Sequence, residues 1–279
     1  MSRLRVVRNL CSALLGVALI GASHTALGQK TPAQKAPVPK TVSVKSAETP
    51  ADIDPLADRD DTKDPPGLKR LSPDGKVWLD AKNKRVVTVG EVCLREGQLE
   101  MFACLKGTKE HESILAVPTK AYVVHAALVA LGAEPGAAAQ FAPKYVAAHG
   151  PRVDVTLFWT DEKGKRQHAN AQDWIRNVKT GKAMTDYWVF GGSGFWKDET
   201  SGQQFYKAED GDFICISNFN SAMLDLPVES SQSNEALLFE AMTDNIPPTG
   251  TKVTLVLTPR LEDKPKASGP SSRKVAPGK

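Results

Sequence analysis

The sequence has few cysteines and none of the short motifs that mark common metal or nucleotide sites. It has four Cys among 279 residues, with no Cys-x-x-Cys, no His-x-His and no His-Glu-x-x-His. A P-loop would need Gly-Lys-Ser or Gly-Lys-Thr, which is also absent. These absences remove the best-known signatures of zinc proteases and nucleotide-binding enzymes. No catalytic residue is therefore named from a motif, and whether the protein is an enzyme stays open.

The central part of the chain lacks an excess of positive charge. The whole sequence carries a net charge of +4, but residues 1–28 hold three Arg and no acidic residue, and residues 264–279 hold five basic and no acidic residues. Residues 71–263 hold 20 basic against 25 acidic side chains, a net charge of −5. A basic face for nucleic acid is therefore not expected.

The N-terminus has the pattern of a signal peptide. Three Arg among the first eight residues precede an apolar run from Leu10 to Ala22, which is too short to span a bilayer comfortably. Small residues occupy the −3 and −1 positions of a cut before Gln29. We expect a signal peptide over residues 1–28, export to the periplasm or the extracellular space, and no transmembrane segment in the mature chain. The alternative is an uncleaved membrane anchor.

Export would place the three remaining cysteines, Cys93, Cys104 and Cys215, in an oxidising compartment. An expected hairpin turn at residues 95–97 puts Cys93 and Cys104 far apart on opposite faces, so these two should not pair. A Cys104–Cys215 disulfide and three buried free thiols both remain open. A four-thiolate iron–sulfur cluster cannot form within one mature chain.

Composition divides the chain into a folded domain with two flanking segments. Residues 29–70 contain seven Pro among Lys, Thr, Ala and Asp, and residues 264–279 are rich in Pro, Ser and Lys. Apolar residues there are too sparse to offset the entropy of ordering, so we predict a disordered linker and a disordered basic tail. The folded domain is predicted over residues 71–263.

Hydrophobic periodicity predicts a fold rich in β-strands. About nine short strands are expected, mostly joined by turns, with a hairpin linking residues 84–94 to 98–104. Helices are expected from Pro118 to Gly132 and from about Asn234 to Met242. We therefore predict one α+β domain with a mostly antiparallel sheet and about two helices.

Several segments between about Lys76 and Arg260 resemble the YdjY family of exported bacterial proteins. They include the Lys109–Ser113 cluster, the helix through His125, the sequence Trp188–Phe195, the sequence Ile214–Phe219 and the sequence Leu224–Ser231. The family resembled is uncharacterised, so the resemblance implies no substrate. Some relatives carry a ferredoxin-like or electron-transfer label, which the small number of cysteines does not support here.

The densest set of reactive side chains is the sequence Glu110-His111-Glu112-Ser113. Imidazole and carboxylate groups bind transition metals, and a carboxylate can also act as a base. We single out His111 as a possible metal ligand and all four residues as a possible ligand site. A solvated turn without chemistry is the competing interpretation.

Two further carboxylates, Asp225 and Glu229, lie four residues apart and could complete this site. His125 on its apolar helix is expected to be a satisfied core histidine. Gly191-Gly192-Ser193-Gly194-Phe195 departs from the Gly-x-Ser-x-Gly of a nucleophile elbow and is expected to be a tight turn. The aromatic residues between Trp159 and Tyr206 are expected to pack the core, although an exposed cluster would suit sugars or peptides.

Two classes of function follow. The first is a non-enzymatic exported module that binds a small ligand, a metal or an envelope partner. The second is a metal-dependent hydrolase in which His111 is a ligand or base and Glu112 or Glu229 is its partner. A redox-associated accessory protein is a third. The cofactor, the substrate and the partner are not given by the sequence.

Overall fold

The computed structural model describes residues 53–57, 64–73, 76–230 and 237–261. The predicted signal peptide and the predicted basic tail lie outside these residues. Of the predicted linker, residues 53–57 and 64–70 are described: Leu56 is buried beside Trp78, and the last two residues form a short strand. Among the described residues, no helix is long and apolar enough to cross a membrane.

The described residues form a mostly β single domain with one α-helix, α1 (Ala121–Ala130). The strands are β1 (Lys69–Arg70), β2 (Val77–Asp80), β3 (Arg85–Val92), β4 (Met101–Leu105), β5 (Ser113–Val117), β6 (Arg152–Thr160), β7 (Arg166–Asn170), β8 (Ile175–Asn177), β9 (Trp188–Phe190), β10 (Phe195–Lys197), β11 (Gln204–Tyr206), β12 (Ile214–Cys215), β13 (Leu224–Asp225), β14 (Phe239–Ala241) and β15 (Lys252–Pro259).

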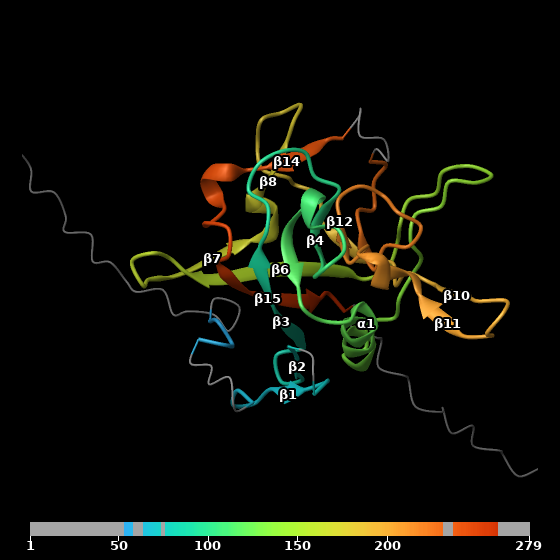
Figure 1. Ribbon diagram of the computed structural model, residues 1–279, viewed down its shortest axis with the longest axis horizontal. Helices are drawn as coiled ribbons and strands as arrows, with labels where there is room; N and C mark the ends of the chain where they lie inside the picture. The colour runs from blue at the N-terminus through green and yellow to red at the C-terminus, as the bar shows by residue number, and fades with distance from the viewer. Residues whose placement is uncertain (1–52, 58–63, 74–75, 231–236, 262–279) are drawn as a thin grey trace, which may run out of the picture. The chain divides into compact units, whose positions relative to one another are not determined.

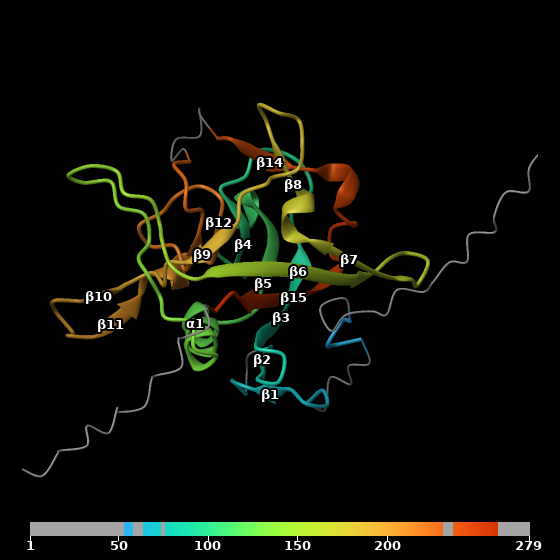
Figure 2. The same cartoon turned by 180° about the vertical axis from the view of Figure 1, so that it is seen from behind.

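Eight strands close into a barrel rather than an open sheet. The order is β3, β15, β6, β9, β13, β12, β4 and β5, and β5 pairs back with β3 (Figures 1 and 2). Pairing is antiparallel except for β4 with β5 and β12 with β13, which are parallel. The sequence predicted the mostly antiparallel pairing but not the closure. The spacing of apolar residues shows which face of a strand is buried, but it does not show which strand lies beside it.

Strand β3 makes the closure possible by changing partners along one edge. Residues 85–88 pair with β2, whereas Glu91 and Val92 pair with β5. Gly90 lies at the change, and a Cβ added there would lie 3.1 Å from Leu255 Cδ1 and 3.3 Å from the Ala116 carbonyl. A glycine therefore lets β15 and β5 approach β3 together.

The barrel interior is filled by large side chains that are fully buried. Phe102 and Trp188 pack with their ring centroids 5.6 Å apart, and Leu157 faces Leu255 across β6 and β15. The Trp188 indole Nε1 donates to the Cys215 carbonyl at 2.8 Å, so its polar edge is satisfied inside the core. The interior is therefore a packed core and does not form a channel.

Helix α1 confirms the first predicted helix. It packs against β2, β3 and the 3-10 helix η4 (Lys207–Asp210). Gly132, with φ of +95°, ends it as expected, and the Ala133 amide donates to the Leu128 carbonyl.

The second predicted helix is wrong where the structure describes it. Residues Phe239–Ala241 form β14, which pairs antiparallel with β8; residues 234–236 lie outside the description. Phe239 and Ala241 are buried while Glu240 faces Arg176, with a carboxylate oxygen 2.9 Å from Arg176 Nε. A period of two, supported by a partner strand, overrides the helical propensity of this segment.

The predicted hairpin between residues 84–94 and 98–104 is also wrong. The Arg95 side chain donates to the carbonyls of Ile246 and Thr243, and the Leu99 amide donates to the Phe239 carbonyl. The expected turn therefore runs beside β14 and the chain after it, and β4 pairs with β5 and β12 instead of β3.

Candidate functional site

The Glu110–Ser113 cluster is a turn that is held by two of its own members. Glu110–Glu112 form the 3-10 helix η2 between β4 and β5. Glu110 Oε1 accepts a hydrogen bond from the Gly107 amide, and Ser113, which is buried, donates its hydroxyl to the Lys109 carbonyl at 2.7 Å. Glu110 and Ser113 thus shape the turn.

His111 is the exposed member of the cluster. Its side chain is 77% exposed, and its Nε2 lies 3.7 Å from Glu112 Oε2. An exposed pair of this kind contributes little to stability. Among the described residues, no group of three or more His, Cys, Asp or Glu side chains is arranged to hold a metal ion.

A polar cluster that the sequence did not reveal lies next to η2. Lys109 Nζ is 2.9 Å from Asp212 Oδ1, and Ser221 donates its hydroxyl to Asp212 Oδ2. Burial and the neighbouring Glu112 carboxylate raise the pKa of Glu100. Burial alone would lower the pKa of Lys109, but the Asp212 carboxylate outweighs it and raises that pKa. The cluster ties η2 to the loop before β12 as one connected network.

Asp225 lies apart from this cluster, at the end of β13. It is fully buried; its Oδ1 accepts from the Leu226 amide at 2.8 Å and from Asn218 Nδ2 at 3.0 Å. Burial raises the pKa of Asp225 to about 7 in spite of these donors. Tyr145 donates its hydroxyl to Asn218 Oδ1 at 2.9 Å, so this network fastens the 134–150 loop to the barrel.

The six predicted site residues therefore fall into two groups. Glu110, His111, Glu112 and Ser113 lie together in η2 and at the start of β5, whereas Asp225 and the exposed Glu229 both lie near Tyr145. Within the described chain, no hydrogen bond or ion pair joins the two groups. Cys93, Cys104 and Cys215 are free thiols, with Cys93 half-buried and the others buried.

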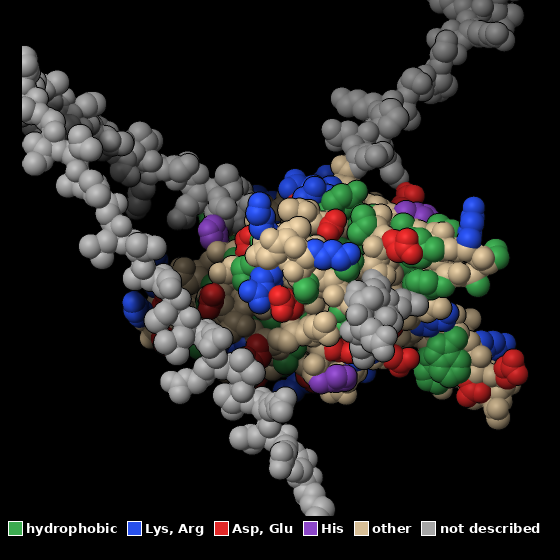
Figure 3. Space-filling model, turned by 90° about the horizontal axis from the view of Figure 1, so that it is seen from above, with side chains coloured by type: hydrophobic (Ala, Val, Ile, Leu, Met, Phe, Trp, Pro, Cys, Tyr) green, Lys and Arg blue, Asp and Glu red, His purple; other side chains and the backbone are tan. Residues whose placement is uncertain are grey.

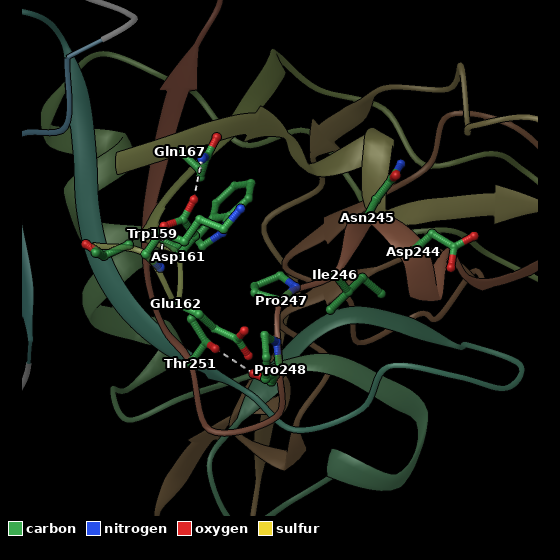
Figure 4. Close-up of a pocket in the computed structure, with 12 residues that line it drawn as sticks. Trp159, Asp161, Glu162, Gln167, Asp244, Asn245, Ile246, Pro247, Pro248 and Thr251 are labelled. Atoms are coloured by element: carbon green, nitrogen blue, oxygen red, sulfur yellow. Dashed lines mark hydrogen bonds between the residues drawn. The ribbon is translucent and has the colours of Figure 1, made fainter. Parts of the chain in front are cut away.

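Two pockets that are lined by described residues lie elsewhere on the domain. One, of about 570 Å³, lies between Trp159 and Asp161 on one side and Pro247 and Pro248 on the other (Figure 4). Asp161 accepts from the backbone amides of Lys163 and Lys165 and from Gln167 Nε2, so its carboxylate holds the β6–β7 turn together. The Asp161 carboxylate is therefore occupied by the turn, whereas Glu162, Lys163 and Asp244 also line this pocket.

The other pocket, of about 560 Å³, lies between α1 and the β10–β11 hairpin and has aromatic walls. We call it the aromatic pocket; it is lined by Lys120, Tyr122, His125, Ala126, Phe195, Gln204, Phe205, Tyr206 and Glu209. Both ribbon views place the hairpin beside α1 (Figures 1 and 2). Phe195 is 61% exposed, Tyr122 53% and Phe205 36%, although each is large and apolar enough to belong in a core.

Cross-strand pairing positions the aromatic walls. Phe195 lies opposite Tyr206, with ring centroids 5.2 Å apart, and Trp196 lies opposite Phe205, stacked at 4.7 Å. The two pairs therefore point to opposite faces of the hairpin. Residues 191–194 connect β9 to β10 without the regular tight turn that was expected, with φ of +83° at Gly192 and +55° at Ser193. The Ser193 hydroxyl donates to the Ser221 carbonyl at 2.6 Å.

His125 is satisfied, as the sequence predicted, but it lines this pocket. Its Nδ1 lies 2.9 Å from Tyr206 Oη, and its ring packs edge-on against Phe190 at 4.9 Å. Burial lowers the pKa of His125, so the ring is neutral at pH 7. The sequence signal that could have located the pocket is the alternation of aromatic residues in β10 and β11, which leaves large rings on both faces of a hairpin.

The YdjY domain family model matches residues 77–258, which is most of the chain. The chain belongs to the YdjY family. The match begins at β2 and ends within β15, so the YdjY domain includes the whole barrel, α1 and the aromatic pocket. No curated protein and no solved structure matches the chain significantly.

The surface of the YdjY domain mixes charges of both signs. In Figure 3 basic and acidic side chains alternate over the face in view, with hydrophobic side chains exposed between them. This face shows no broad patch of one sign, in keeping with the balance of charges read from the sequence.

Asp225 predicts a measurable dependence of stability on pH. Between about pH 4 and pH 7 the folded state keeps a proton on Asp225 that the unfolded chain has released, so stability falls as the pH rises through this window. Asp225→Asn keeps an oxygen for both donors and cannot ionise. Between pH 5 and pH 8 its free energy of unfolding, from urea titrations, should fall by less than that of the wild type, and the difference should be at most about 3 kcal/mol. An equal fall in both proteins would contradict the assignment.

The role of His111 as a metal ligand stays a prediction. If it holds, the purified wild type, dialysed against Zn²⁺ and then against buffer, should retain about one equivalent more zinc than His111→Ala. His168→Ala, which removes a histidine from β7, is the matched control. Equal zinc content in all three proteins would end the proposal for His111.

Proposed function

We propose that this YdjY domain is an exported module that binds a small ligand in the aromatic pocket. The observation that carries the proposal is the exposure of two large aromatic side chains, Tyr122 and Phe195, around one concave site. Burying a ring of this size would stabilise the protein by about 2 kcal/mol, and this free energy is not gained while the ring stays in water. A ligand that covers them would recover part of it, and the pocket volume falls in the range used for small molecules.

The polar groups of the pocket favour binding over catalysis. Burial raises the pKa of Tyr206, so its phenol keeps its proton at neutral pH. Glu209 is engaged by the Tyr122 amide, which donates to Oε1 at 3.0 Å, and by Lys120 at 3.8 Å. Neither group is an activated nucleophile. The metal-dependent hydrolase with His111 and Glu112 or Glu229, the redox-associated role and the envelope partner stay as unproven alternatives.

The pocket is tested with an uncharged aromatic fluorophore, N-phenyl-1-naphthylamine. We expect saturable fluorescence enhancement with the wild type, and a dissociation constant about three- to tenfold higher in Phe195→Ala and in Tyr122→Ala, since each removes one aromatic contact. Tyr187→Ala removes an exposed ring outside the pocket and should bind as the wild type does. Identical titrations for the wild type and both pocket variants would place the probe elsewhere and contradict the proposal.

Export is tested on the full-length chain in a bacterial host. We expect the protein in the periplasmic fraction or the medium, with an N-terminus at Gln29 when the fragment is sequenced. Replacing Leu14 and Leu15 with Arg interrupts the apolar run and should leave the chain uncleaved inside the cell. A wild-type chain that keeps Met1 in the membrane fraction would support the uncleaved anchor instead.

A further inference from the structure

The hydrogen bonds of Tyr206 determine which nitrogen of His125 carries the proton. The Tyr206 hydroxyl lies 3.1 Å from the Gly192 carbonyl and 2.9 Å from His125 Nδ1. A carbonyl oxygen can only accept, so the single proton of Tyr206 goes to Gly192. The contact with His125 is then an Nδ1–H donating to Tyr206 Oη. A neutral ring with its proton on Nδ1 has a bare lone pair on Nε2.

That lone pair is available to a ligand. His125 is half-buried and lines the aromatic pocket; besides Tyr206, its ring interacts with the Gly192 backbone carbonyl, which accepts only from a protonated nitrogen and therefore leaves a bare Nε2 unpaired. An acceptor held in place by a second residue and left unpaired in a pocket is suited to a ligand hydroxyl or N–H group. Gln204 adds an amide that can both donate and accept.

The charges of the pocket offset one another. Lys120 and Glu209 form an ion pair at 3.8 Å, and Glu209 also accepts from the second amide of α1, where a negative charge complements the helix dipole. Neither charge is left over to neutralise a charged ligand. The pocket therefore favours an uncharged ligand.

The walls favour a rigid ligand with an apolar face. Phe195 is held against Tyr206, with ring centroids 5.2 Å apart, so the position of its ring is set before any ligand arrives. Fixed aromatic rings bind flat apolar surfaces with little loss of side-chain entropy. A pyranose ring combines such a face, made of C–H groups, with hydroxyl donors around its edge.

We propose that the aromatic pocket binds a neutral saccharide, with a C–H face of the sugar on Phe195 and a sugar hydroxyl donating to His125 Nε2. The proposal rests on the proposed function of the same pocket. Tyr206 is the positioning residue, because it acts on the ligand through the tautomer of His125. A peptide would also offer N–H donors, and it is one of the outcomes that the test separates.

The test measures displacement of N-phenyl-1-naphthylamine and, independently, heat of binding by calorimetry. Cellobiose is the probe, since its equatorial hydroxyls leave C–H groups on both ring faces. Sorbitol has hydroxyls without a rigid face, and glucuronic acid has the ring with a charge. We expect cellobiose to displace the fluorophore, sorbitol not to, and glucuronic acid to bind at least tenfold more weakly than cellobiose.

Two variants link binding to the geometry. Phe195→Ala should weaken cellobiose binding about tenfold. Tyr206→Phe keeps the ring and removes the hydroxyl; it should weaken binding five- to tenfold and, in ¹⁵N NMR, change His125 from one tautomer to a mixture of two. His168→Ala should change neither measurement. A Tyr206→Phe protein with unchanged binding and an unchanged His125 spectrum would overturn the role of Tyr206.

The outcomes separate the two proposals. If the fluorophore binds in the pocket but cellobiose neither displaces it nor gives heat, the saccharide proposal fails and the binding pocket stands. If a tri-alanine peptide displaces the fluorophore and cellobiose does not, the ligand class is peptide and the saccharide proposal fails. If Phe195→Ala alters neither probe, the pocket and the saccharide proposals fail together.

Discussion

The change of partners along β3 is the constraint on which the rest of the molecule depends. One edge of β3 pairs first with β2 and then with β5, while its other edge pairs with β15. The ring of strands therefore closes at β3. The absence of a side chain at Gly90 allows the three strands to meet there. Closure removes the open edges of the eight barrel strands, which would otherwise be free to pair with other chains.

Closure also bears on where a ligand can bind. Phe102, Leu157 and Trp188 are fully buried in the interior, and both pockets lined by described residues lie outside it. A concave surface forms instead between elements that lie outside the barrel, such as α1 and the β10–β11 hairpin. Glu209 joins these two elements, because it belongs to η4 directly after β11 and accepts a hydrogen bond from the second amide of α1.

Local structure could be predicted from the sequence wherever one face alternates clearly or a breaker is present. The strand over residues 152–160 and the helix ending at Gly132 are confirmed on those grounds. Partner choice could not be predicted, because the carbonyls that Arg95 reaches lie about 150 residues further along the chain. The segment Phe239–Ala241 was predicted wrongly for the same reason. Its short sequence fits both a helical period and a strand period, and pairing with β8 selects the strand.

The candidate site illustrates a different limit. Clusters such as Glu110-His111-Glu112-Ser113 attract notice because their reactive groups are adjacent in the sequence, yet two of these four residues, Glu110 and Ser113, serve to hold the turn. The aromatic pocket is built from α1, β10, β11 and η4, and its exposed rings are ordinary hydrophobic residues when read singly. Their exposure is a property of the fold, and hydrophobic pattern alone assigns such residues to the core.

The position of β15 has a consequence for how the chain is made. This strand ends the folded domain at Pro259, yet it lies between β3 and β6 and supplies the longest ladders of the ring. Until it leaves the ribosome, one edge of β3 and one edge of β6 have no partner, and the ring cannot close. Closure of the barrel therefore waits for synthesis of the last strand, although the strands before it can already pair with one another.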